Sequence, residues 1–183
     1  MDWYAFARAA VAVVLLSAAA AKLASGGSTR PFLAALGVPD GLAGPVSAAL
    51  PAAEAVCAVL LLAGSGLWAV LPAAALTVGF AGVLGWAAQA GISEGCRCFG
   101  AVDASRTPAA AGLLRALVLA AVTVALAVAA PSARWALPAP ALLTGALAGW
   151  VYIGLFAMGG QVWMFERERA VRKPRLVPTE EPI

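Results

Sequence analysis

The stretch WYAFARAAVAVVLLSAAAAKL, residues 3–23, is the first of five long apolar runs, and it decides the class of fold. Only Arg8 and Lys22 in it are charged, and its length is close to the roughly 20 residues that a helix needs to cross a bilayer. The whole chain of 183 residues is similar, with 63% hydrophobic and 11% charged residues. Soluble domains carry about 25% charged residues. A chain of this length cannot bury so much apolar surface within itself, so we expect the bilayer to be its solvent.

Four more apolar runs follow, at about residues 42–63, 67–91, 108–130 and 137–158. Only helices and closed barrels satisfy their backbone in lipid, and the alternating ten-residue segments of a barrel are missing. We therefore predict an all-α integral membrane protein, with a four-helix transmembrane bundle plus a fifth C-terminal transmembrane helix in residues 1–165. Residues 166–183 are charged and proline-rich, which predicts a solvated helix end followed by a disordered tail.

The first run also has small residues near its end, as a cleaved signal peptide does. Its opening, MDWYAF, is acidic and aromatic rather than basic, and it extends the run to spanning length. We therefore expect this run to be a retained span.

Four ionisable side chains lie inside the predicted spans, where a charge costs several kcal/mol. Arg8 is near a helix end, so we expect its side chain to snorkel to the headgroups. Lys22 closes the first span, and both snorkelling and a functional role account for it. Glu54 is expected to stay protonated unless a cation is beside it. Arg115 cannot lose its charge, so it requires a partner or a wet cavity.

These polar positions are expected to gather at one end of the bundle. The connections before the second and fourth spans lie on the same face of the membrane, because each span reverses the chain. Lys22 ends the first span at that face, while Glu54 and Arg115 lie in the entering halves of the second and fourth spans. Cys96 and Cys98 lie in the later connection. We predict a polar pocket there, roofed by the cysteine-bearing connection.

The motif Cys96-Arg97-Cys98 admits three interpretations. A zinc or iron–sulfur site requires three or four ligands, and the chain has no histidine and only one further thiol, so no metal site is expected. Two unrelated free cysteines are the second interpretation. The third, which we favour, is a redox pair, because a disulfide between residues two apart is strained and therefore easily reduced. Arg97, with Lys22 or Arg115 beneath, would favour the thiolate and so activate the pair.

Cys57 lies three residues after Glu54, on the same helix face. It is either a third redox thiol that reaches the pocket or, as is more common for a lone cysteine in an apolar helix, a small buried residue.

The pattern resembles the MauE branch of the MauE/DoxX-like membrane proteins. The matching pieces are RAAVAVVLLSAAAAKL at 8–23, LPAAEAVCAVLLLAG at 50–64, GCRCFG at 95–100 and LLRALVLAA at 113–121. The resemblance implies a four-helix redox membrane protein that works with a membrane-anchored thioredoxin-like partner in maturing the disulfide-rich small subunit of methylamine dehydrogenase. In layout the family looks like quinone-linked four-helix oxidases such as vitamin K epoxide reductase. By this resemblance Cys96 and Cys98 are the redox pair, and Lys22, Glu54 and Arg115 are its polar support.

The fifth apolar run departs from this four-helix pattern. Its end, GGQVWMFERERAVRKP at 159–174, is similar to the anchor that precedes the thioredoxin domain in such partner proteins.

Two signals for the orientation of the cysteine-bearing connection disagree. A disulfide catalyst is expected to act outside the cytoplasm, where disulfides persist. The face that holds this connection, however, carries nine basic residues, and the positive-inside rule would place them in the cytoplasm. These are Lys22, Arg30, Arg97, Arg106, Arg167, Arg169, Arg172, Lys173 and Arg175. The other face carries two, Arg8 and Arg134. On the strength of the resemblance we expect a multi-pass protein of the cell membrane with its cysteines on the extracytoplasmic side.

The leading hypothesis is an enzyme, a membrane thiol–disulfide oxidoreductase that exchanges disulfides with a thioredoxin-like protein. Its electrons would leave through a membrane quinone near Cys96, Glu54 and Arg115, since the chain has no haem ligands and no nucleotide-binding fingerprint. No covalent cofactor and no nucleic-acid partner are expected. Two alternatives remain open: a transporter whose pathway is lined by Lys22, Glu54 and Arg115, and a non-catalytic scaffold subunit of a membrane complex.

Overall fold

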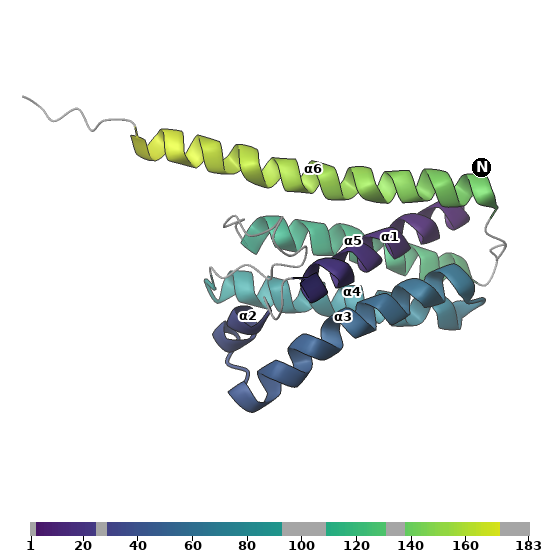
Figure 1. Ribbon diagram of the computed structural model, residues 1–183, viewed down its shortest axis with the longest axis horizontal. Helices are drawn as coiled ribbons and strands as arrows, with labels where there is room; N and C mark the ends of the chain where they lie inside the picture. Colours follow the sequence, from purple (N-terminus) through teal and green to yellow (C-terminus); the bar gives the residue numbers. More distant parts are fainter. Residues whose placement is uncertain (1–2, 25–28, 93–108, 131–137, 173–183) are drawn as a thin grey trace, which may run out of the picture.

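The computed structural model describes residues 3–24, 29–92, 109–130 and 138–172, with side chains described only for 112–130 and 138–155 in the last two ranges. These residues form helices and the short turns beside them, and none of the described residues lies in a strand. The helices are α1 (Trp3–Ala24), α2 (Arg30–Ala35), α3 (Asp40–Ala63), α4 (Leu67–Gln89), α5 (Ala109–Ala129) and α6 (Ala139–Arg172), as Figure 1 shows.

The predicted all-α membrane fold with four spanning helices is confirmed. Helices α1, α3 and α4 and the stretch Gly112–Ala129 of α5 are long and apolar enough to cross a bilayer. The described apolar part of α6, Ala139–Leu155, is shorter than a span, so the fifth transmembrane helix stays a prediction. The short helix α2 was not predicted, because six residues after a polar link carry too little periodicity to stand out.

Helix α1 occupies the centre of the bundle and packs against α3, α5 and α6, while α4 packs against α3 and α5. One end of the bundle, which we call the α2 end, holds α2, the start of α3, the end of α4 and the start of α5 (Figure 1). The opposite end holds the turn between α3 and α4. This turn is tight, because a side chain on Gly64 would come within 2.5 Å of the Leu60 carbonyl oxygen, and Gly66 adopts a φ of 72°.

The interior is divided into two apolar clusters. One joins α1, α3, α4 and α5 around Tyr4, Leu15, Leu61, Val70 and Leu126. The other joins α4 and α5 at the α2 end and receives Phe32 from α2. One of the buried Thr77 and Thr123 hydroxyls donates to the other across the α4–α5 interface at 2.7 Å, and each lies 2.9 Å from a carbonyl oxygen of its own helix. The hydroxyls therefore tie two helices together without leaving unsatisfied polar atoms in an apolar setting.

Candidate functional site

A buried ion pair between Lys22 and Glu54 joins α1 to α3. The Lys22 Nζ atom donates to Glu54 Oε1 at 2.5 Å, and the two residues are 4% and 1% exposed. The Lys22 ammonium also lies 5.6 Å from the centroid of the Phe80 ring on α4. The second carboxylate oxygen, Glu54 Oε2, is buried and has no hydrogen-bond partner among the described residues. The Glu54 Oε2 atom can therefore still accept a hydrogen bond, since no described residue donates to it.

The positions of these two residues follow from their helices. Lys22 lies in the last turn of α1, where the helix dipole favours a cation. The Lys22 side chain turns inward and donates to Glu54, so Lys22 does not snorkel to the headgroups. Glu54 lies buried in the body of α3, and Lys22 supplies the cation that an ionised carboxylate requires there.

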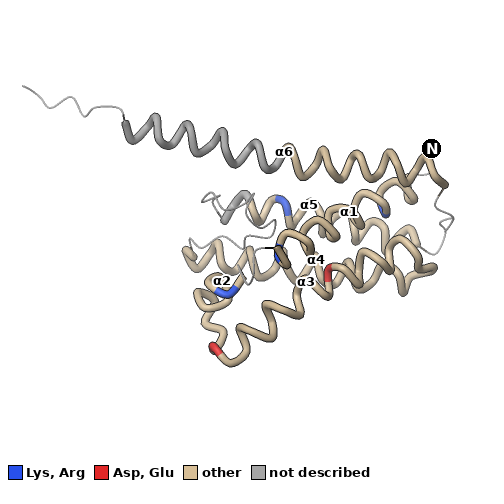
Figure 2. Tube along the Cα trace, viewed as in Figure 1, with Lys and Arg blue, Asp and Glu red and all other residues tan. Residues whose placement is uncertain are grey.

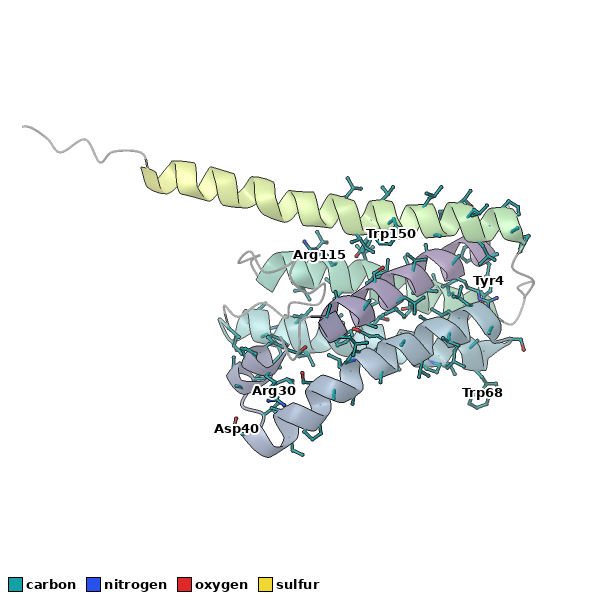
Figure 3. The ribbon with its side chains drawn as sticks, viewed as in Figure 1. Tyr4, Arg30, Asp40, Trp68, Arg115 and Trp150 are labelled. Carbon is teal, nitrogen blue, oxygen red and sulfur yellow. The ribbon has the colours of Figure 1, made fainter. Side chains whose placement is uncertain are left out.

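Arg115 is 6% exposed and lies near the start of the described part of α5. Figure 3 shows it on the side of α5 that faces α6. From α6, the Tyr152 hydroxyl donates to the Arg115 carbonyl oxygen at 3.0 Å. The sequence did not predict this bond, because it depends on how α6 docks.

The cysteine motif itself, Cys96-Arg97-Cys98, lies outside the described residues. What the structure describes are the two points at which this segment joins the bundle. Ile92, just after α4, packs on the apolar cluster at the α2 end, and α5 begins at Ala109 at the same end (Figure 1). Figure 2 shows that the charged positions of the described helices gather mainly in that half of the bundle.

Cys57 is buried in the apolar cluster that contains Leu15 and Leu61. It lies one turn from Glu54 on α3, but apolar side chains surround it in that cluster. This environment suits a small packing residue better than an exchanging thiol, which must meet a partner in solution. In the described parts of the chain, no three His, Cys, Asp or Glu side chains are grouped so that they could hold a metal ion.

The expected snorkelling of Arg8 is wrong. Its side chain is 0% exposed and turns toward the C-terminus of α3. Its Nη2 atom donates to the carbonyl oxygens of Leu61 at 2.5 Å and Gly64 at 3.0 Å, and its guanidinium lies 5.8 Å from the centre of the Tyr4 ring. The last carbonyls of a helix lack intrahelical donors, so a cation there satisfies them and the helix dipole together. One feature of the sequence could have indicated this contact. The first span begins, with Arg8 near its start, on the membrane face at which the second span ends.

The family model described as methylamine utilisation protein MauE matches residues 2–130. No curated protein and no solved structure matches the chain. The matched range contains α1 to α5, the Lys22–Glu54 pair, Arg115 and the cysteine motif, and it ends before α6 begins. The resemblance seen in the sequence is thereby confirmed.

Proposed function

The chain belongs to the MauE family and is a multi-pass membrane protein, and from this premise we propose that it is a membrane thiol–disulfide oxidoreductase whose redox pair is Cys96 and Cys98. The observation that carries the proposal is the buried Lys22–Glu54 pair in the bundle whose α2 end receives the cysteine segment.

A buried ion pair in a membrane helix bundle needs a reason. Removing two charges from water costs several kcal/mol for each ion, and a packed apolar pair of similar volume is usually at least as stable. Ionisable residues inside membrane spans therefore mark functional sites by default. Here the pair, together with Arg115 on α5, provides charges in the bundle to which the C-x-C segment is attached at both ends.

The proposed cycle moves two electrons and two protons. In the first half, a thiolate of a membrane-anchored thioredoxin-like dithiol attacks the Cys96–Cys98 disulfide and forms a mixed disulfide. The second thiol of the partner then attacks the mixed disulfide, so the partner becomes the disulfide and Cys96 and Cys98 become the dithiol. In the other half, the dithiol becomes a disulfide again and a membrane quinone takes both electrons and both protons to become the quinol. Arg97 and Arg115 favour the thiolate form of Cys96 and Cys98, which is the leaving group in the first half and the electron donor to the quinone in the second, and Lys22 and Glu54 support the site.

The test is the redox state of Cys96 and Cys98 in native membranes with the quinone pool present and depleted. Alkylation of free thiols followed by mass spectrometry reports the two residues separately from Cys57. We expect the pair to be oxidised with quinone and reduced without it, and a Cys57→Ala variant to behave like the native chain. A pair that stays in one state under both conditions would contradict the proposal.

We also propose that α6 is a fifth membrane span. Its 34 residues extend about 51 Å, which exceeds a hydrocarbon core of about 30 Å. Alkaline phosphatase and green fluorescent protein fused after Arg134 and after Ile183 report the membrane sides of the two ends of α6, and opposite sides support the span while the same side contradicts it. With five spans the tail shares a face with the C-x-C segment, so alkaline phosphatase activity supports the extracytoplasmic orientation and green fluorescence supports the cytoplasmic one.

A second candidate, a transporter of small molecules or reducing equivalents, is favoured by the buried Glu54 Oε2 atom, for which the described residues provide no hydrogen-bond partner. The Cys96→Ser/Cys98→Ser variant separates the two functions. A transporter of non-thiol cargo keeps its activity in that variant, and an oxidoreductase loses it.

A further inference from the structure

Helix α6 lies outside the range that the family model matches, yet it is seated on α1 by backbone contact. A side chain on Gly145 would come within 2.5 Å of the Phe6 carbonyl oxygen. One on Gly149 would come within 2.9 Å of the Ala10 carbonyl oxygen. Small residues at an interface let two membrane helices approach this closely. Larger side chains at these two positions would therefore lift α6 off α1.

The contact follows one stripe of α6. Ala141 is 3% exposed and lies four residues before Gly145, and Tyr152 lies three residues after Gly149. Positions spaced by four, four and three residues share one face of a helix. The Tyr152 hydroxyl donates to the Arg115 carbonyl oxygen of α5 at 3.0 Å. The stripe therefore combines three small buried residues with one hydrogen-bond donor that reaches α5.

The opposite face of α6 is turned away from the bundle. Leu143, Leu147 and Trp150 on it are 68%, 66% and 62% exposed. The two faces thus differ in chemistry, because the outer face carries large apolar side chains and the seated face carries small ones. Only the seated face has the small residues that a close helix–helix contact requires.

We call the surface that α6 covers the α1–α5 face. It belongs to the part of the chain that the family model matches, whereas its occupant does not. A bundle that ended with α5 would expose this face. The face consists of Phe6, Ala9, Ala10 and Val13 on α1 and the Arg115 carbonyl on α5.

We propose that the α1–α5 face is a binding site for a transmembrane helix of a second membrane protein, and that α6 is a tethered helix that occupies it. The partner helix that fits has small residues four positions apart and a hydroxyl-bearing side chain three positions after the second. This inference rests on the proposal that α6 crosses the membrane, and it makes no use of the thiols.

The tether determines which helix occupies the face. Helix α6 begins ten residues after α5 ends, so it is held near the face at an effective concentration on the order of millimolar. A free helix of the same sequence competes poorly with it. Displacing α6 opens the face to that helix.

The test uses a peptide of residues 138–160 as the free helix. The full chain, with a fluorescent protein after Ile183, is reconstituted in vesicles with the dye-labelled peptide, and energy transfer reports binding. We expect a Gly145→Leu/Gly149→Leu chain, whose α6 is displaced, to bind the peptide about a hundredfold more tightly than the native chain does. Equal binding to both chains, or binding to neither, overturns the inference.

Variants of the peptide show whether it uses the same contacts as α6. A peptide with Gly145→Leu and Gly149→Leu should not bind the displaced chain. A Gly154→Leu peptide is the matched control and should bind like the native peptide, because no described atom lies within 4 Å of that side-chain position. Tyr152→Phe should weaken binding by about threefold, the typical effect of one interhelical hydrogen bond. Tight binding by the peptide with both leucines contradicts the proposal.

An engineered disulfide tests occupancy without displacing α6, so it stays informative if the leucine chain does not fold. The Gly149 side-chain position lies 3.1 Å from the Val13 Cβ atom, slightly below the Cβ separation of about 3.8 Å in disulfides. With Cys57→Ala, Cys96→Ser and Cys98→Ser, an oxidised Val13→Cys/Gly149→Cys chain should form this disulfide within one chain. It should then bind about tenfold less peptide than the same chain reduced.

Three results of the disulfide experiment overturn the inference. A disulfide between two chains would assign the α1–α5 face to α6 of a second copy. The absence of any disulfide would mean that α6 is not seated there, and equal peptide binding by the oxidised and reduced chains would place the peptide elsewhere. The fusions after Arg134 and Ile183 separate this inference from the proposed span. If α6 spans and the peptide does not bind, only this inference fails; if both ends of α6 lie on one side, both fail.

Discussion

Replacing Lys22 by Met or Glu54 by Leu leaves one buried ion without its partner. We expect each single change to destabilise the bundle by about 4 to 5 kcal/mol, and the double variant to stay within about 1 kcal/mol of the native chain. At 2.5 Å the two charges attract by about 7 kcal/mol for an effective dielectric constant of about 20. Desolvation costs several kcal/mol for each ion and offsets this attraction, so the intact pair contributes little net stability.

The expected cost of each single change has a ceiling, because the group left behind can lose its charge before it is buried. At pH 7 this costs about 4 kcal/mol for an ordinary glutamate and about 5 kcal/mol for an ordinary lysine. The two variants should therefore depend on pH in opposite directions. In Lys22→Met the unfolded state binds fewer protons than the folded state, so stability rises by about 3 kcal/mol from pH 7 to pH 5. In Glu54→Leu the unfolded state binds more protons, so stability rises by about 3 kcal/mol from pH 7 to pH 9.

The measurement is equilibrium unfolding by sodium dodecyl sulfate in dodecyl maltoside micelles, followed by the fluorescence of the six tryptophans. Val56→Leu is the control, because Val56 lies on the same helix as Glu54 but is exposed on the bundle surface, and it should change stability by less than about 0.5 kcal/mol. Single variants that cost less than about 1 kcal/mol would refute the reasoning. So would a double variant as unstable as the sum of the singles, or pH slopes of the same sign.

Three further predictions use the same unfolding measurement. Arg8→Met removes the donors to the Leu61 and Gly64 carbonyls and should cost about 3 kcal/mol, and a cost near zero would mean that Arg8 reaches water after all. Thr123→Val should cost about 0.6 to 1.7 kcal/mol because it breaks the bond to Thr77, and Thr123→Ser should restore most of the loss. Gly145→Leu should cost about 1 to 3 kcal/mol by forcing α6 from α1, whereas equal stability would contradict the close contact.

Much of the fold could be predicted, because the length of an apolar run is read along the chain without knowing what surrounds it. The run at 3–23 became α1, and the runs at 42–63 and 67–91 became α3 and α4. Alternation of spans also placed Lys22 and Glu54 on the same side. Helix α2 was not predicted. Its Phe32 is buried by a cluster of residues from α4 and α5, and that contact cannot be seen in the local sequence.

The chemistry of the buried charges could not be predicted in the same way. Arg8 was expected to reach the headgroups, and its acceptors belong to a helix end 53 and 56 residues away. A snorkelling arginine and an arginine that caps another helix have the same local sequence. The bond from Tyr152 to the Arg115 carbonyl likewise depends on the docking of α6 through Gly145 and Gly149.

The sequence by itself determined that this is a helical membrane protein of the MauE family, where its spanning helices lie, and which of them carry charges. Those properties depend on hydropathy and residue order, because each apolar segment enters the bilayer according to its own length and composition. Only the tertiary structure decided that Lys22 meets Glu54, that Arg8 caps α3 and that α6 lies against α1. A buried charge takes the partner that packing brings within hydrogen-bond distance, and packing joins residues that are far apart in the chain.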